Sequence, residues 1–489
     1  MARVSRTAWP VPRPVIIGRM GLRFRNTLGG EVEEFQPLEP GHVRMYSCGP
    51  TVYAPAHVGN FRSFLFADLA RRYLEWSGLR VTWVMNVTDV DDKIIRGAAA
   101  EGVSIRELAA RYSQRFEDDL ARLRIARPDF IPHATDHVPE MVELIEILKR
   151  NGNAYGTADG SVFFSIASWP AYGRLARLDP TRQRVGERVE DDEYSKDDVR
   201  DFALWKGAKL GEPSWVTSLG DGRPGWHIEC SAMAMRYLGR SFDIHTGGVD
   251  LIFPHHEDEI AQSEAATGEP FVRTWLHCAH LRMGGQKMSK RTGGFARPED
   301  VYELGFEPRV LRYALLAAHY RAPLDFSEGS LAAAASAVDR LSTCLTALDA
   351  YRQEGPDDPG LAIMLTTTRD AFRDALDDDL NIAPALAAVF DLVRVLNRRL
   401  ADRSLSSSDA RRAAASVRDL DGVLAVAEAD AAEPMEEVER LLTERAAARE
   451  ARDWQRADAI REQLGHMDIL VEDTADGQRW RRSAEVSRV

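Results

Sequence analysis

The segment from Arg44 to Val84 constrains the fold more than any other stretch of the chain. Residues 44–48 alternate as a short strand, and residues 60–76 repeat apolar side chains at helical spacing. Residues 79–84 are rich in β-branched and aromatic side chains, which favours a buried strand. Strand, loop, helix and strand make a βαβ unit, the building block of a parallel sheet whose ligands bind at the carboxyl ends of its strands. We therefore predict an α/β fold.

Composition narrows the function classes. A chain of 489 residues suggests about three domains, and 44% hydrophobic with 28% charged residues excludes a wholly disordered chain. The net charge of −13 excludes a generic nucleic-acid binder, so any RNA contact needs local basic patches. Only four cysteines in 489 residues indicate a reducing, cytoplasmic location. No apolar stretch reaches about 18 residues, the length that would predict a membrane span. Residues 1–20 are basic, as in a transit peptide, but three prolines favour a loose arm.

A first candidate phosphate-binding segment lies between the predicted strand and helix. Residues 48–60 end at a helix start, where free N–H groups and the helix dipole attract phosphate. His57 can donate a hydrogen bond to a phosphate oxygen, and Gly59 beside Asn60 leaves room for a nucleotide. The alternative is a turn histidine that caps the helix.

A second candidate segment spans residues 286–294. Lys287 and Lys290 stand three positions apart in a loop with flanking glycines, and lysine is a compact charge suited to phosphates. A solvated lysine pair is the alternative interpretation. The presence of His57 more than 200 residues upstream makes the phosphate interpretation the stronger one.

Two cysteines, a histidine and a glutamate suggest a metal site. His255 and Glu259 are four positions apart, so on a helix they face the same side. Together with Cys48 and Cys230 they offer a tetrahedral Zn²⁺ set. Because the cysteines are 182 positions apart, spacing leaves open buried structural cysteines and a helix-capping histidine.

These segments resemble those of class I aminoacyl-tRNA synthetases, and the likeness to the cysteinyl-tRNA synthetases covers essentially residues 21–489. The resemblance implies a Rossmann-type catalytic domain with an inserted segment, a helical bundle and a small C-terminal α/β domain. The motifs that carry it are Cys48–Tyr53, Asn86–Lys93, Asp201–Lys206, Gly225–Cys230, Pro254–Glu257 and Lys287–Lys290.

The resemblance also implies the chemistry. Cysteine is activated with ATP to cysteinyl-adenylate and then passed to the terminal adenosine of cysteine tRNA. One Zn²⁺ on Cys48, Cys230, His255 and Glu259 reads the substrate thiol, and Mg²⁺ accompanies ATP. His57, Lys287 and Lys290 are the expected catalytic phosphate-binding groups, with Gly59 and Asn60 in the ATP site. Gly49, Thr88 and Trp226 are expected to line the cysteine pocket, although Trp226 could instead be a core aromatic.

One departure from the family pattern affects the second signature segment. Residues 291–294 read Arg-Thr-Gly-Gly, where the family usually has Ser and then Gly-Asn. Both lysines remain, so we expect a working loop with altered ATP affinity.

Changes in amino-acid composition along the chain predict the domain boundaries. We expect an arm over 1–20, a catalytic domain over 21–330, a helical tRNA-binding bundle over 331–402, a linker over 403–434 and an anticodon-binding domain over 435–489. Within the catalytic domain, the inserted segment is expected at about 125–200 and the signature-loop segment at about 275–330. In the last domain, Trp480 among Arg479, Arg481 and Arg482 can stack a splayed base while the arginines meet phosphates. A solvated basic tail is the alternative.

Two other functions compete with a cysteine–tRNA ligase. A cysteine–glucosaminyl-inositol ligase of mycothiol synthesis shares the activation chemistry but lacks an anticodon-binding end. A synthetase-like RNA-binding protein without catalysis is supported only by the departure at residues 291–294. The family suggests a monomer without a membrane partner.

Overall fold

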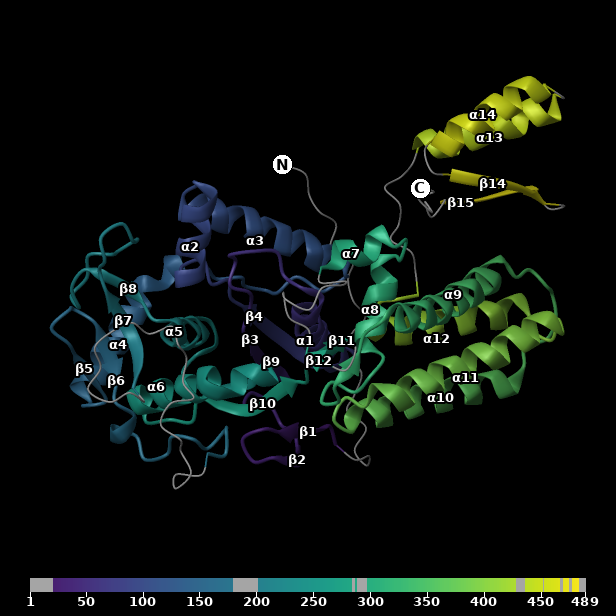
Figure 1. Ribbon diagram of the computed structural model, residues 1–489. Helices are drawn as coiled ribbons and strands as arrows, with labels where there is room; N and C mark the ends of the chain where they lie inside the picture. The colour runs from purple at the N-terminus through teal and green to yellow at the C-terminus, as the bar shows by residue number, and fades with distance from the viewer. Residues whose placement is uncertain are drawn as a thin grey trace.

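A parallel sheet of four strands lies at the centre of the first half of the chain (Figure 1). Its strands follow the order β10 (Val272–Cys278), β9 (Phe242–Gly248), β3 (His42–Ser47) and β4 (Arg80–Met85). Helix α1 (Val58–Trp76) connects β3 to β4. The predicted βαβ unit is therefore confirmed. The computed structural model describes residues 21–178, 201–283, 286–287, 297–427, 436–451, 453–466, 469–474 and 477–482.

The register of the sheet sets where the site forms. Ser47 at the end of β3 stands opposite Met85 of β4 and Thr246 of β9. Three neighbouring strands therefore finish at one edge, because parallel strands share a direction. Helix α1 covers this sheet with Phe61, Leu65 and other apolar side chains that are fully buried.

A second, antiparallel sheet is inserted between β4 and β9. Its strands are β5 (Ala154–Gly156), β6 (Val162–Phe164), β7 (Phe202–Gly207) and β8 (Gly222–Pro224). It lies on the side of the parallel sheet away from the helical bundle (Figure 1). The predicted end of the insertion at about residue 200 is wrong, because β7 and β8 pair with β6 and carry the sheet to Pro224.

Four long helices form the bundle. They are α9 (Glu328–Ala350), α10 (Pro359–Asp377), α11 (Ile382–Ala401) and α12 (Ser407–Leu424). The last of these corrects the linker predicted over 403–434. The serine-rich run that suggested a linker is a helix start, since the Ser406 hydroxyl accepts the Asp409 N–H at 2.9 Å. Apolar side chains of α12, among them Val417 and Leu420, are buried in the large core.

Helix α9 is the one helix among the described residues that is long and apolar enough to cross a membrane. Eight of its side chains are buried, and it packs on α8 (Pro308–Leu316), α11 and α12. One such helix is weak evidence for a span, since core helices have the same composition.

A small unit follows at the C-terminus. Helices α13 (Glu436–Glu450) and α14 (Trp454–His466) precede the antiparallel pair β14 (Ile469–Thr474) and β15 (Gly477–Arg482). The unit has its own core of Leu441, Leu442, Ile460, Leu464 and Val471. The predicted helix pair with short strands is present. The remaining strands and α-helices are β1 (Arg23–Asn26), β2 (Glu31–Glu34), α2 (Asp92–Glu101), α3 (Ile105–Arg122), α4 (Val138–Arg150), α5 (Trp226–Leu238), α6 (Glu257–Thr267), β11 (Leu281–Met283), β12 (Gln286–Lys287), α7 (Pro298–Glu303) and β13 (Leu324–Asp325).

Candidate metal centre and nucleotide site

Four side chains that are distant in sequence converge at the carboxyl edge of the parallel sheet. Cys48 directly follows β3, Cys230 lies on α5, and Glu259 lies in the first turn of α6. His255 belongs to the irregular turn Ile252–His256 that precedes α6. The ligand atoms of these four residues all lie within 4.8 Å of one another. The structure therefore brings the whole predicted set together.

The separations between these atoms suit a tetrahedral zinc ion. Cys48 Sγ is 3.7 Å from Cys230 Sγ and 3.6 Å from Glu259 Oε1, and His255 Nε2 is 3.1 Å from Glu259 Oε1. Ideal zinc bonds imply about 3.8 Å between two sulfurs, about 3.5 Å from sulfur to oxygen and about 3.3 Å from nitrogen to oxygen. Two thiolates, an imidazole and a carboxylate also form a donor set that zinc favours. The residues present fit Zn²⁺.

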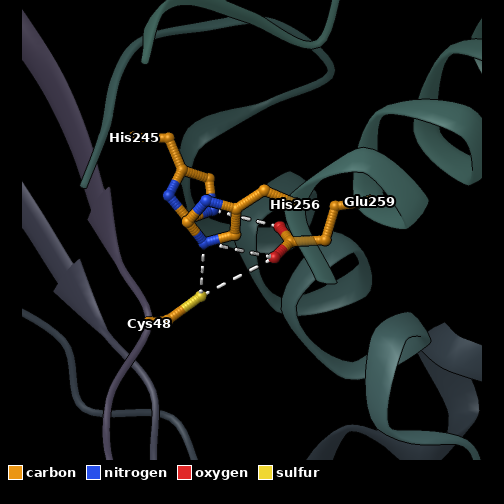
Figure 2. A group of neighbouring side chains, drawn as sticks. All are labelled: Cys48, His245, His256 and Glu259. Carbon is orange, nitrogen blue, oxygen red and sulfur yellow. Dashed lines mark hydrogen bonds and ion pairs between the residues drawn. The ribbon is translucent and has the colours of Figure 1, made fainter. Parts of the chain in front are cut away.

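Two further histidines, which the sequence analysis missed, overlap this set. His245 on β9 and His256 group with Cys48 and Glu259, as Figure 2 shows. His245 Nε2 lies 3.0 Å from Glu259 Oε2, and His256 Nε2 lies 3.3 Å from Cys48 Sγ. Their sequence signals are weak: one is a single histidine within the short segment 242–248, and the other is a second histidine beside His255.

His245 and His256 are better placed behind the ligands than as ligands. His256 Nε2 is 3.9 Å from Glu259 Oε1, longer than the separation of about 3.3 Å expected between a nitrogen and an oxygen on one tetrahedral zinc ion. Its Nδ1 bonds His277 Nε2 at 2.8 Å, and His277 Nδ1 bonds the Thr27 hydroxyl at 2.7 Å. Burial lowers the pKa of His256 well below its usual range and that of His277 to about 3, so both rings are neutral. Such hydrogen-bonded partners orient metal ligands.

The charges of the cluster favour a bound cation. A hydrogen bond from Cys48 lowers the pKa of Cys230 to about 6, whereas burial raises the pKa of Cys48 well above its usual range. The two thiols therefore share one proton. Burial opposes ionisation of Glu259, but His245 and His255 together outweigh it and lower the pKa of Glu259 to about 2. A cation that binds thiolates and a carboxylate displaces the remaining proton.

His57 caps helix α1. Its Nδ1 accepts the Asn60 N–H at 3.2 Å, and the Asn60 Oδ1 accepts the His57 N–H at 3.1 Å. The capping alternative is thus present in the structure, and it leaves the proton of a neutral His57 ring on Nε2. Gly59 is half-buried and Asn60 is exposed in the first turn. The ATP-binding roles of all three residues stay predictions.

The lysine segment is described only in part. Lys287 lies in β12, where it stands opposite Arg282 of β11 in an antiparallel pair. Lys290 and residues 291–294 lie outside the described residues. The phosphate-binding role of both lysines and the effect of the altered sequence stay predictions.

The predicted cysteine-pocket residues border the metal cluster. The Gly49 N–H donates to Asn86 Oδ1 at 2.9 Å, and a Cβ on Gly49 would lie 1.7 Å from the Asn86 carbonyl oxygen, so only glycine fits. The Thr88 hydroxyl donates to Glu229 Oε2 at 2.9 Å. Neither Asn86 nor Glu229 was predicted as a site residue.

Trp226 covers one of the metal-set histidines. Its ring stacks on His255 with centroids 4.2 Å apart, and 38% of its surface is exposed. It is therefore not a core aromatic. An exposed aromatic ring directly over His255, a predicted zinc ligand, is a suitable wall for a small substrate.

The remaining predicted residues lie elsewhere. Arg479, Trp480, Arg481 and Arg482 are on strand β15, and their side chains lie outside the described part of the chain. Cys278 on β10 and Cys344 on α9 are buried and form no disulfide.

Comparison with known proteins identifies the family. A model described as "tRNA synthetases class I (C) catalytic domain" matches residues 34–336. Cysteine–tRNA ligase of Koribacter versatilis (strain Ellin345) is 44% identical over 495 residues, covering 95% of this chain and 100% of that protein. The chain belongs to the cysteine–tRNA ligase family. The enzyme of the same name from Solibacter usitatus (strain Ellin6076) is 46% identical over 470 residues, covering 95% of this chain and 100% of its own.

Two other family models match the C-terminal part of this family member. A DALR domain matches residues 371–428, which includes α12, and a cysteinyl-tRNA ligase anticodon-binding domain matches residues 433–481. Among solved structures, Mycobacterium tuberculosis methionyl-tRNA synthetase in complex with methionyl-adenylate aligns with a TM-score of 0.57 and 16% identity. The alignment covers 79% of this chain and 90% of that one. It confirms the predicted class I synthetase fold.

Proposed function

We propose that the chain acts as a cysteine–tRNA ligase. The carboxylate of L-cysteine attacks the α-phosphate of ATP, which gives cysteinyl-adenylate and pyrophosphate. The 3′-terminal adenosine hydroxyl of cysteine tRNA then takes the cysteinyl group and releases AMP. The single observation that carries the proposal is the convergence of two cysteines, a histidine and a glutamate within 4.8 Å, beside the nucleotide loop of a class I domain.

The metal set supports selection of cysteine over serine. Zn²⁺ held by Cys48, Cys230, His255 and Glu259 would supply a soft Lewis acid, which bonds a thiolate far better than a hydroxyl. Gly49 permits the close approach of its loop to Asn86, and Thr88 and Trp226 border the same cluster. We place the cysteine substrate against these three residues. Because the metal would distinguish sulfur from oxygen directly, selection of cysteine over serine requires no editing domain.

The nucleotide site stabilises charge. The Nε2–H of His57 at the start of α1 is suited to donate to a phosphate oxygen, and the helix dipole adds positive potential there. Lys287 and Lys290 would meet the other phosphates, while Gly59 and Asn60 line the nucleotide. Mg²⁺ is proposed to enter with ATP. The protein mainly orients the reactants, because phosphoryl chemistry of this kind needs little covalent help.

The RNA partner is proposed to bind along the C-terminal half. The match of residues 433–481 to an anticodon-binding domain supports this placement. Arg479, Trp480, Arg481 and Arg482 on β15 are proposed contacts, with stacking by the tryptophan and phosphate pairing by the arginines. We further propose a cytoplasmic monomer, in keeping with four cysteines that form no disulfide.

Charging of tRNA by purified protein tests the function. Labelled L-cysteine should pass to deacylated cysteine tRNA with ATP and Mg²⁺. Cys230→Ala should lose bound zinc and at least about 100-fold in charging, because one ligand and its geometry are lost. Cys344→Ala is the matched control, since Cys344 is a buried cysteine on α9 and should leave both unchanged.

Other outcomes point to the alternatives. Cysteine-dependent ATP–pyrophosphate exchange without charging would move the acceptor away from tRNA and favour an amino-sugar ligase. Absence of both reactions in folded, zinc-loaded protein would favour an RNA-binding protein without catalysis.

A further inference from the structure

Arg62 on helix α1 makes an unusual set of contacts. Its side chain is buried, and its guanidinium donates to four backbone carbonyls. Nη1 lies 2.8 Å from the carbonyl oxygens of both Ala279 and His280. Nη2 lies 2.5 Å from the carbonyl oxygen of Ala322 and 3.4 Å from that of His319.

The four carbonyls belong to two segments that lie beside the hairpin of β11 and β12. This hairpin contains Lys287 and is called the lysine hairpin. Ala279 and His280 connect β10 to β11, and β11 pairs with β12, which contains Lys287. His319 and Ala322 lie between α8 and β13, and β13 pairs with β11 from the other side. Arg62 therefore holds the base of the hairpin from both sides.

The same helix carries the other phosphate-binding segment. His57 is the N-cap of α1, and Arg62 lies five positions further along. The guanidinium is thus a direct link between the helix that positions His57 and the hairpin that positions Lys287. Four backbone carbonyls around the guanidinium leave little freedom for movement relative to α1.

The charge of Arg62 argues for a specific role. None of the ion pairs found in the described part of the chain includes Arg62, and burial lowers the pKa of its guanidinium. A buried charge without a carboxylate partner costs more than an apolar side chain of similar size. Its planar fork of five donors reaches all four carbonyls, whereas a lysine ammonium has only three donors, all on one nitrogen.

We propose that Arg62 is a positioning residue for adenylate formation, which fixes the lysine hairpin relative to the helix capped by His57. The inference rests on the proposed function, because both segments are assigned to ATP phosphates there. Arg62 itself is not placed on the substrate.

Two variants and a matched control test the role. Arg62→Lys keeps the charge, and Arg62→Met keeps an unbranched apolar stem without the charge. Both should lower kcat of cysteine-dependent ATP–pyrophosphate exchange about 10- to 100-fold, since a displacement of about 1 Å has an effect of this size. Zinc content and KM for cysteine should change less than twofold. Transfer from isolated enzyme–adenylate to tRNA should stay within threefold, because ATP is then no longer present.

Arg312→Lys is the control. Arg312 is also fully buried and bonds the carbonyls of Leu123, Arg124 and Leu424, but it pairs with Asp68 away from the hairpin. It should lower the melting temperature without changing kcat per folded molecule. Equal kinetic losses in Arg312→Lys and Arg62→Lys would overturn the proposal.

Hydrogen–deuterium exchange separates this inference from the proposed function. The Leu324 and Phe326 amides bond the His280 and Arg282 carbonyls, so they should exchange faster in Arg62→Lys than in the control. Unchanged protection, or wild-type kcat in folded Arg62→Lys, refutes the positioning role even if the wild type charges tRNA. A second outcome is a wild-type protein without ATP–pyrophosphate exchange activity, combined with faster hydrogen–deuterium exchange in Arg62→Lys. That outcome refutes the proposed function and with it the catalytic role of the link.

Discussion

Gly49→Ala is the sharpest test of how the metal centre is built. A Cβ at this position would lie 1.7 Å from the Asn86 carbonyl oxygen and 2.9 Å from its carbonyl carbon. Both atoms are backbone, so the loop after β3 must move by more than about 1 Å to reach van der Waals separation. The Gly49 N–H to Asn86 Oδ1 bond, worth about 1 kcal/mol, is lost as well.

The movement reaches the metal set directly, because Cys48 is the preceding residue. Zinc ligands tolerate errors of about 0.2 Å. We therefore expect Gly49→Ala to lose stoichiometric zinc and about 100-fold or more in cysteine-dependent ATP–pyrophosphate exchange. Metal analysis after gel filtration and initial exchange rates measure the two effects.

A second glycine-to-alanine variant serves as the control, because it adds the same methyl group at a position where nothing is crowded. A Cβ on Gly422 in α12 meets nothing within 4 Å, so Gly422→Ala should keep zinc and activity. The unfolding free energy of Gly422→Ala should also exceed that of the wild type by about 0.5–1 kcal/mol, because alanine is more favourable than glycine inside a helix. Full zinc and normal exchange in Gly49→Ala would refute the close-approach reasoning.

Three other outcomes follow from the buried groups. Arg312→Met should lower the unfolding free energy in urea by about 3 kcal/mol, because it removes the 2.5 Å partner of the buried Asp68 carboxylate; an unchanged midpoint would contradict this. Burial and the neighbouring Glu299 raise the pKa of Asp119 to about 7, so the protonated form contributes stability at acidic pH that is lost as pH rises through 7. The melting temperature of Asp119→Asn should thus be higher than that of the wild type at pH 8 but not at pH 5. A difference in melting temperature that is independent of pH would contradict this prediction. Thr88→Val should raise KM for cysteine about tenfold, equivalent to about 1.4 kcal/mol, and leave KM for ATP unchanged; equal rises would place Thr88 outside the cysteine pocket.

Local patterns in the sequence determined the elements that depend on neighbours along the chain. The alternation in residues 44–48 and the helical spacing in residues 60–76 correspond to β3 and α1, and the helix pair with its short strands is present at the C-terminus. One prediction that was made from composition instead of periodicity failed, namely the linker over 403–434. The serine-rich run near Ser406 suggested a linker, although the same hydroxyl that favours turns also caps α12.

The metal set is an intermediate case. Residue types and family likeness named Cys48, Cys230, His255 and Glu259, but spacing alone left buried structural cysteines as an alternative. Only the tertiary structure places the four ligand atoms within 4.8 Å, and only it adds His245, His256 and Asn86 around them. The physical reason is that periodicity reports which side of its own element a residue faces. The order of strands in the sheet, with β3 between β9 and β4, decides which ends meet. That order depends on pairing between residues as far as 199 positions apart, such as Ser47 and Thr246.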